Sequence, residues 1–376
     1  MKKILSIISI ILIIVCLIFV LFIKDTDKED FIQLDKEGSI AIVYPNKLGI
    51  YSIKEDRFVK QMNFPLTISE ETNFDFAPIG KELLFSTGYP SSKKSMFKIG
   101  RINMETGEYK ENIRAAFPTT GEGYDDKFFY TMTSEVGNGT LIHQINAKGE
   151  EVNKAILEKE SLGRKIIGAK NQVLMLAGIE DLEMSETFYS TRLFFYDKDT
   201  MDTQGSYQFD ELSDDYLLGL TDMELINETL YLPITAKRNR VNPGEDMLSS
   251  EILSFDLKTK EKRFIQLDEN YPTGIKKDKN EQRLLIFHEP NMLKKWIISI
   301  YNLENHEVIT INIQELLHEP QEEITRWRAE TTRDNKLIIY TGKYMMLYDM
   351  KKKILVDTIE LEDVEQNMGL YIYSYG

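Results

Sequence analysis

The sequence predicts an all-β fold, a seven-bladed β-propeller that is preceded by an N-terminal transmembrane helix. Two observations predict the propeller: a strand–turn–strand pattern that recurs seven times, and short apolar runs that are bounded by turn-forming residues. Strand-rich repeats with a period of roughly 40 to 50 residues are typical of propeller blades. A third observation, an uncharged apolar run at the start of the chain, predicts the helix.

The first element is this apolar run of twenty residues, from Ile4 to Ile23. As a helix, at ~1.5 Å per residue, it would cover the ~30 Å hydrocarbon layer of a bilayer. Lys2 and Lys3 precede it and an acidic segment follows, so the positive-inside rule places the N-terminus in the cytoplasm and the rest outside the cell membrane. A cleaved signal peptide is the alternative, although no small-x-small cleavage site precedes Asp25. We expect residues 1–24 to be a single-pass anchor and residues 25–38 a charged linker.

Each repeat contains an anchor residue, an aromatic residue or Ile that ends a predicted strand and is followed by Ser, Asn or Asp. Consecutive anchors lie 43 to 59 residues apart. The polar side chain after the anchor can accept hydrogen bonds from backbone N–H groups just ahead of it, which favours a tight turn. The seven anchors are Tyr51, Ile102, Ile145, Tyr196, Phe255, Tyr301 and Tyr348. They predict seven blades over residues 39–376; six or eight blades, or an irregular sandwich of hairpins, are the alternatives.

The second blade shows the predicted strand order most clearly. An apolar run such as Leu83-Leu84-Phe85, bounded by turn residues, is typical of a strand buried on both faces. The expected strands, from inner strand A to outer strand D, are Thr72–Ala77, Glu82–Thr87, Ser95–Asn103 and Glu108–Ile113. The A–B turn, Ala77-Pro78-Ile79-Gly80-Lys81, resembles the Ser-Pro-Asp-Gly-Lys turn of TolB-type and WD40-like propeller repeats, with Ala and Ile in place of Ser and Asp. The resemblance implies a propeller blade and no particular activity.

The ring has to close, and blade one lacks an inner strand of its own. We predict that the C-terminal tail, Gly369 to Tyr375, supplies this strand, because closure removes an exposed sheet edge. The alternative is that Phe31 to Leu34 supplies it.

Composition excludes several classes of function. The chain has 46 basic and 61 acidic side chains and a net charge of −15, so it should repel nucleic acid, and we predict no nucleic-acid partner. The single cysteine, Cys16, lies in the apolar N-terminal run. The rest of the chain therefore has no disulfide, zinc–thiolate site or cysteine nucleophile.

No catalytic residue, metal site or cofactor is predicted. The four histidines show no metal-ligand spacing, and no nucleophile-elbow, Walker or dinucleotide-binding motif occurs. Asp197-Lys198-Asp199 lacks the later glycine and glutamate of a calcium loop, and the repeat's own turn explains it.

The candidate binding residues lie mainly in two insertions, residues 179–190 of blade four and 236–250 of blade five. Both are B–C loops, which emerge on the same face as the D–A loops, and insertions on one face typically mark the working face of a repeat array. Acidic residues in the blade-four loop beside basic residues in the blade-five loop would steer a charged partner to this face. The alternative is that the two charge clusters are only solvated and bind no partner. Trp327, at the start of the seventh inner strand, is placed at the channel mouth, with packing as the alternative. The predicted binding residues are Glu180, Asp181, Glu183, Lys237, Arg238, Arg240 and Trp327.

These observations favour a membrane-anchored, extracytoplasmic propeller that acts as a binding or scaffold module of the cell envelope. Its expected partner is another envelope protein or a peptide, held at the face of the B–C and D–A loops. The alternative is a propeller hydrolase or lyase whose acids and histidines meet at the central channel. A close pair of carboxylates with a raised pKa in a deep channel pocket would favour the enzyme, and a face without such a pair would favour binding.

Overall fold

The computed structural model describes residues 38–44, 47–63, 73–88, 96–115, 117–118, 123–135, 139–157, 161–180, 189–209, 216–239, 245–317, 327–361 and 371–375. The predicted membrane span lies outside these ranges. Within them, no helix has both the length and the apolar character needed to span a bilayer.

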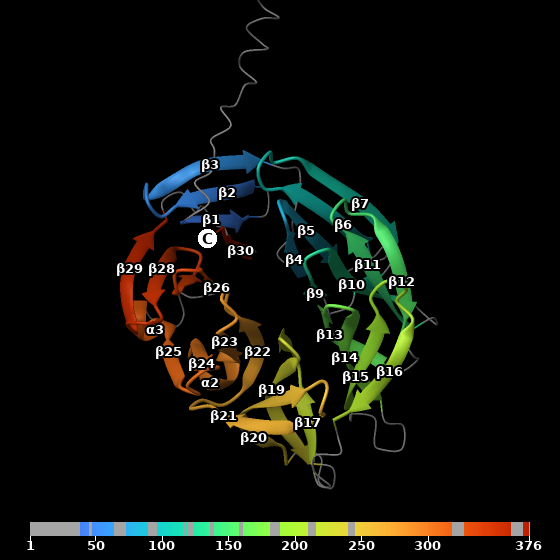
Figure 1. Cartoon of the computed structure of the whole chain (residues 1–376). Coiled ribbons are helices and arrows are strands. Elements are labelled where there is room, and N and C mark those ends of the chain that lie inside the picture. The colour runs from blue at the N-terminus through green and yellow to red at the C-terminus, as the bar shows by residue number, and fades with distance from the viewer. Residues whose placement is uncertain are drawn as a thin grey trace, which may run out of the picture.

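The described residues form seven antiparallel β-sheets arranged in a ring (Figure 1). In each blade, four strand positions follow one another from the centre of the ring outward. Blade one contains β30 (Tyr371–Ser374), β1 (Ser39–Val43), β2 (Lys47–Ser52) and β3 (Arg57–Asn63). Blade two contains β4 (Asn73–Ile79), β5 (Glu82–Gly88), β6 (Met96–Asn103) and β7 (Tyr109–Ala115). Blade four contains β13 (Ser161–Gly168), β14 (Gln172–Glu180), β15 (Tyr189–Asp197) and β16 (Thr203–Gln208).

Blades six and seven have the same four-strand order, with two short helices beside blade six. Blade six contains β22 (Pro272–Lys277), β23 (Arg283–His288), β24 (Ile297–Asn302) and β25 (Val308–Asn312). Blade seven contains β26 (Arg328–Thr331), β27 (Lys336–Tyr340), β28 (Tyr344–Asp349) and β29 (Ile354–Glu360). The helices are α2 (Pro290–Leu293), in the B–C connection, and α3 (Ile313–Leu317), which follows β25.

The inner strand is interrupted in blades three and five. In blade three, β8 (Phe117–Pro118) and β9 (Gly123–Tyr124) pair separately with β10 (Phe128–Glu135). In blade five, β17 (Tyr216–Leu220) and β18 (Glu224–Ile226) both pair with β19 (Thr229–Asn239). The remaining strands of these blades are β11 (Gly139–Asn146), β12 (Glu151–Ile156), β20 (Met247–Asp256) and β21 (Lys262–Gln266). Such breaks in a ladder change the direction in which side chains point.

The C-terminal tail closes the ring, as predicted. Strand β30 pairs antiparallel with β1, with Ile40 opposite Ser374 and Val43 opposite Tyr371. The backbone N–H of Tyr375 donates to the Ser39 carbonyl at 3.0 Å. Figure 1 shows the C-terminus next to β1, at the inner side of blade one. The alternative segment, Phe31 to Leu34, lies outside the described residues.

The turn that defines the repeat has the predicted chemistry in every blade. Asn103 Oδ1 accepts hydrogen bonds from the backbone N–H groups of Glu105 and Thr106 at 3.0 and 2.9 Å. The same type of bond is made by Ser52, Asn103, Asn146, Asp197, Asp256, Asn302 and Asp349. The anchor before each of them is buried, with at most 6% of its surface exposed. The prediction of seven blades is therefore confirmed.

The hydrophobic core lies between neighbouring blades. One cluster joins Leu176 and Leu193 of blade four to Leu232 and Phe255 of blade five. Each such side chain stabilises the fold by roughly 1.5–3 kcal/mol when fully buried, so packing between blades contributes substantially to the stability of the ring. Blade two confirms its expected strands to within two residues. Strand β4 extends past the predicted end because Pro78 and Ile79 pair with Leu83 and Glu82.

Candidate functional site

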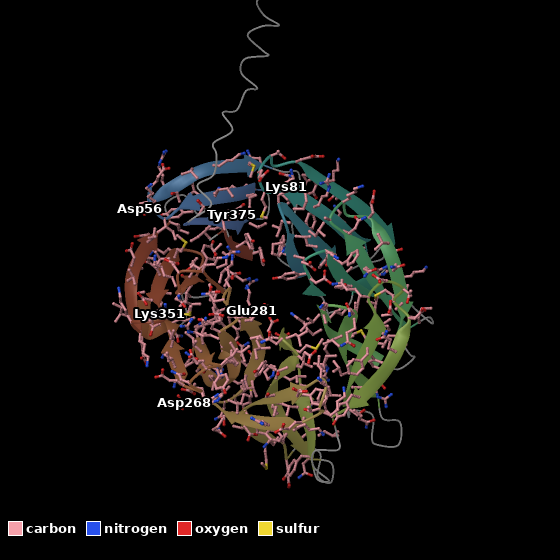
Figure 2. All side chains as sticks on the ribbon, in the orientation of Figure 1. Asp56, Lys81, Asp268, Glu281, Lys351 and Tyr375 are labelled. Atoms are coloured by element: carbon pink, nitrogen blue, oxygen red, sulfur yellow. The ribbon has the colours of Figure 1, made fainter. Side chains whose placement is uncertain are left out.

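A cavity of about 840 Å³ lies at the centre of the ring and is lined by residues from all seven blades. The lining comes mainly from the inner strands and the A–B turns, including Asp125 to Lys127 of blade three and Asp278 and Lys279 of blade six, and Lys198 and Phe287 add to it. Figure 2 shows Glu281 at the inner side of the ring, whereas Asp268 and Lys351 lie toward the outside. A volume of this size is ordinary for a small-molecule or peptide-end pocket.

Tyr124 of the interrupted inner strand β9 reaches into this cavity. The preceding Gly123 packs so closely against β13 that a Cβ atom there would lie 1.6 Å from the Ile166 carbonyl oxygen. Only glycine allows the two backbones to approach so closely, and this contact fixes the position of the next residue, Tyr124. Tyr124 keeps 40% of its surface exposed, because the space around its ring is the cavity. Its charged neighbours come from four other blades: Lys165, Glu224, Lys276 and Glu330.

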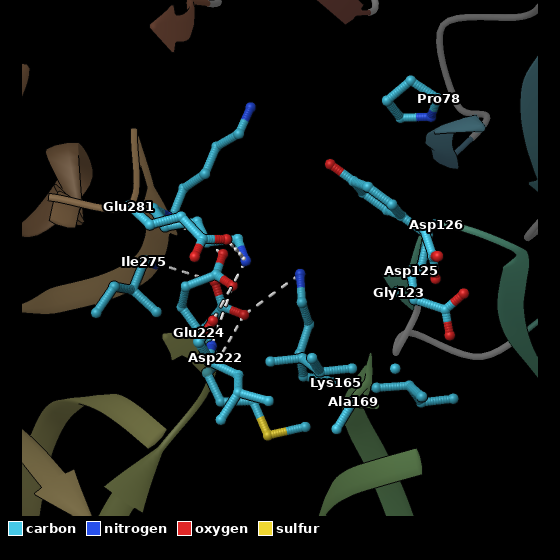
Figure 3. A pocket seen from close by; sticks show the side chains of 18 of the residues that line it. Pro78, Gly123, Asp125, Asp126, Lys165, Ala169, Asp222, Glu224, Ile275 and Glu281 are labelled. Carbon is cyan, nitrogen blue, oxygen red and sulfur yellow. Dashed lines mark hydrogen bonds and ion pairs between the residues drawn. The ribbon is translucent and has the colours of Figure 1, made fainter. Parts of the chain in front are cut away.

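Ion pairs connect neighbouring blades around the cavity. Lys276 Nζ of blade six lies 2.5 Å from Glu330 Oε2 of blade seven, whose side chain is buried. Lys165 Nζ of blade four lies 3.4 Å from Asp222 Oδ1 of blade five, a pair that Figure 3 shows. Lys198 of blade four pairs with Asp125 of blade three at 2.8 Å, and within blade six Lys277 pairs with Glu281 at 2.6 Å. Most carboxylates of the cavity are therefore already neutralised by a partner.

Two carboxylates of blade five bond the inner strand of blade six. Asp222 Oδ2 accepts a hydrogen bond from the Ile275 N–H at 3.0 Å, and Glu224 Oε2 accepts one from the Lys277 N–H at 3.2 Å. Glu224 Oε1 also accepts from the Leu225 N–H at 3.0 Å. Burial raises the pKa of Glu224, against the opposing effect of Lys277. Because both of its oxygens bond backbone groups, Glu224 serves to join the blades.

Lys279 differs from the paired lysines. Its Nζ donates to the Ser374 carbonyl of β30 and lies 4.3 Å from the centroid of the Tyr373 ring. Burial lowers the pKa of Lys279 to about 8, because the effect of the nearby Glu330 carboxylate only partly offsets it. Within the described residues, no carboxylate lies at ion-pair distance from this ammonium group. Lys279 therefore links the cavity to the strand that closes the ring.

The structure describes only part of the rim predicted from the two insertions. Asp181, Glu183 and Arg240 lie outside the described residues, and Glu180 is described only as the backbone end of β14. Lys237 and Arg238 belong to β19. Lys237 Nζ lies 2.6 Å from Glu251 Oε2 and 5.7 Å from the Phe264 ring centroid, so it is paired within its own blade. A bipolar rim stays a prediction.

Trp327 packs against aromatic side chains of blade six. Its ring centroid lies 5.3 Å from that of Phe287 and 6.0 Å from that of Trp296, the latter at an interplanar angle of 86°. Trp327 belongs to the apolar cluster of blades six and seven and is not among the residues that line the cavity. This geometry is that of a packing residue.

None of the three described histidines lines the cavity. His143 Nδ1 lies 2.6 Å from Glu151 Oε2, and His306 Nδ1 lies 2.7 Å from the Tyr301 hydroxyl. His288 Nδ1–H donates to the Asn270 carbonyl, so its Nε2 accepts from Ser299 Oγ. Burial lowers the pKa of His288 and keeps it neutral. His318 lies outside the described ranges, within which no group of three potential metal ligands occurs.

Comparison with known proteins supports the architecture alone. No family model matches the chain, and no curated protein matches it in sequence. Among solved structures, 747 chains match the fold. One of them is described as dihydro-heme d1 dehydrogenase NirN in complex with DHE; it has a TM-score of 0.51 and 12% sequence identity, and the match covers 91% of this chain and 76% of that one. The chain is a seven-bladed β-propeller. Since this fold carries many unrelated activities, the function of the propeller has to be argued from its cavity.

Proposed function

We propose that the protein is a binding module of the cell envelope, anchored in the membrane by residues 4–23 and holding a protein or peptide partner outside the cell. The observation that carries this proposal is the central cavity of about 840 Å³, to which all seven blades contribute. The left-handed Gly80, with φ of +61°, in the A–B turn of blade two supports the likeness to TolB-type repeats. That likeness concerns the blade and not the partner.

The chemistry of the cavity supports binding over catalysis. A general acid or base has to present a free oxygen or nitrogen to its substrate. Glu224 has the raised pKa that an enzyme would require, but both of its oxygens accept backbone hydrogen bonds. Asp222 and Glu330 are paired with lysines, and the described histidines lie elsewhere. Charged and tyrosine side chains around a solvent-accessible space are well suited to reversible polar contacts.

The cavity is lined from the side of the A–B turns, opposite the B–C and D–A loops. Large parts of those loops, residues 181–188, 240–244 and 318–326 among them, lie outside the described residues. Partner binding at the loop face therefore stays a separate hypothesis. An experiment on the whole protein has to compare the two faces directly.

Site-specific photo-crosslinking in native membranes makes this comparison. The only natural cysteine is replaced by Cys16→Ser, and one cysteine is then added and coupled to a benzophenone maleimide. Lys170→Cys, at an exposed site of the cavity lining, probes the cavity. Met247→Cys, at a 46% exposed site of the blade-five insertion, probes the loop face, and Ile156→Cys, at a 66% exposed site on outer strand β12, is the control. We expect a discrete adduct from Lys170→Cys alone. An adduct from Met247→Cys alone moves the partner to the loop face, and equal labelling from all three sites contradicts specific binding.

A further inference from the structure

The charge of the cavity differs from that of the protein as a whole. The chain has a net charge of −15, yet its cavity is lined by equal numbers of basic and acidic side chains. The basic ones are Lys127, Lys165, Lys170, Lys198, Lys276, Lys277 and Lys279. The acidic ones are Asp125, Asp126, Asp222, Glu224, Asp278, Glu281 and Glu330. A lining with equal numbers of both charges repels an anion less than the acidic average of the molecule does.

Three of these lysines have no carboxylate within ion-pair distance in the described part of the chain: Lys127, Lys170 and Lys279. By contrast, Asp278 is bonded to Arg283 at 3.2 Å, and Glu224 bonds backbone N–H groups. Among the lining groups for which no ion pair occurs in the described residues, three are therefore lysines and one, Glu224, is a carboxylate. Lys127 and Lys170 are exposed, whereas Lys279 is partly buried, and an ion pair gains most where water is partly excluded.

Tyrosine hydroxyls add neutral hydrogen-bond donors to the same region. Those of Tyr124, Tyr371 and Tyr373 have no hydrogen-bond partner within the described residues. The surrounding protein partly excludes bulk water from each of these hydroxyls and so raises the pKa of each tyrosine, and each hydroxyl keeps its proton. Lys276 and Glu330 are electrostatic neighbours of both Tyr124 and Lys279, and Tyr371 is a neighbour of Tyr124. The free donors are thus gathered in one part of the cavity.

We propose that this part of the cavity binds a carboxylate, and specifically the free C-terminal carboxylate of a peptide or protein chain. Lys279 supplies the charge, and the hydroxyls of Tyr124 and Tyr371 donate hydrogen bonds to the two oxygens. Glu224 and Glu330 stand nearby, so a doubly charged group such as phosphate is disfavoured by repulsion. This inference rests on the proposed function and names the chemical group that the cavity holds.

The test uses the full-length protein in detergent and two tripeptides, N-acetyl-Ala-Ala-Ala with a free carboxylate and the same peptide as its C-terminal amide. Calorimetric titration should show the acid binding at least about tenfold more tightly than the amide, because a charge-assisted contact is lost in the amide. Inorganic phosphate at equal concentration should not displace the acid. Equal affinities of acid and amide, displacement by phosphate, or no binding up to about 10 mM would overturn the proposal.

Substitutions test which residues of the cavity bind the carboxylate. Lys279→Met and Tyr124→Phe should each weaken binding of the acid, whereas the exposed turn variant Lys258→Met should not. Lys279→Arg should restore binding because the guanidinium stays charged. Unchanged affinity in folded Lys279→Met would contradict the assignment. Absence of tripeptide binding while the Lys170→Cys crosslinked adduct is still formed would remove this inference and leave the proposed function intact, whereas absence of both removes both.

A pH titration provides a readout that a structural role would not change. The groups that face Lys279 are Lys276, Glu330, Arg333 and Tyr373. The Glu330 carboxylate favours the protonated form of Lys279, whereas the positive charges of Lys276 and Arg333 disfavour it. With a pKa of about 8, Lys279 loses its proton just above neutrality, so affinity for the tripeptide acid should fall as pH rises through 8. The decline should be absent in Lys279→Arg. A wild-type affinity that is constant from neutral to clearly alkaline pH would contradict the role of Lys279.

Discussion

Removing the closing strand is the sharpest perturbation of this ring. A chain that stops after Leu370 lacks β30, which contributes Ile372 at 2% exposure and Ser374 at 1%, and four residue pairs with β1. Burial of one large aliphatic side chain is worth ~1.5–3 kcal/mol, and each hydrogen bond is worth ~0.5–1.5 kcal/mol. The side-chain bond from Ser374 Oγ to the Thr331 carbonyl, at 2.8 Å, is lost as well.

Together these terms amount to about 5–10 kcal/mol, which approaches the whole stability of a typical domain. We expect the truncated chain to lose cooperative urea unfolding, followed by far-ultraviolet circular dichroism and by the fluorescence of Trp296 and Trp327. Ile372→Ala in the full chain should cost about 2–4 kcal/mol. Ile354→Ala, at a 51% exposed site on the outer strand β29, should stay within about 0.5 kcal/mol and serves as the control. An unchanged unfolding midpoint in the truncated chain would refute the account of ring closure.

Three further predictions concern single groups. Asn103→Ala should lower the free energy of unfolding in urea by about 1–3 kcal/mol, because Asn103 Nδ2 donates to the buried Glu82 carboxylate at 2.7 Å; no loss would contradict this role. Backbone N–H groups lower the pKa values of Asp256 and Asp349, so their stabilisation is present above about pH 4 and is lost as pH falls through the lowered values. In the variant with both Asp256→Asn and Asp349→Asn, the free energy of unfolding should fall less steeply than in the wild type as the pH is lowered. Equal slopes in the two proteins would contradict the stabilising role of these carboxylates. Since burial lowers the pKa of Lys279 from 10.5 to about 8, the unfolded chain binds more protons between these values. The wild type should therefore gain stability relative to Lys279→Met as pH rises from 8 to 10.5, and a constant difference would contradict the lowered pKa.

The repeat could be predicted from the sequence because its chemistry is local. Asp256 accepts hydrogen bonds from Lys258 and Thr259, two and three residues ahead, so the turn is visible within a short window. The same holds for the buried anchor Phe255, which directly precedes Asp256 at the end of β20. Closure of the ring by the C-terminal tail could also be predicted from the sequence, because a propeller blade without an inner strand leaves one sheet edge unpaired.

The cavity could not be predicted in the same way, because its members converge from distant blades. Tyr124, Lys165, Lys276 and Glu330 are separated by dozens of residues and meet only once the ring has closed. A signal was present: lysines and acids in strands expected to be buried, such as Lys276 in β22, have to face a solvent-accessible space. The backbone breaks in blades three and five, which place Tyr124 and Glu224, depend on packing between blades, as at Gly123.

The central claim, that the cavity of the propeller holds the partner, is tested most directly by filling it. In the Cys16→Ser background, Tyr124→Cys is coupled to a bulky maleimide, with the same label on Ile156→Cys as the matched control, and partners are co-purified from native membranes. The account predicts that the cavity label abolishes co-purification while the label on the outer strand leaves it intact. Undiminished co-purification with a fully labelled, folded Tyr124→Cys protein would contradict it.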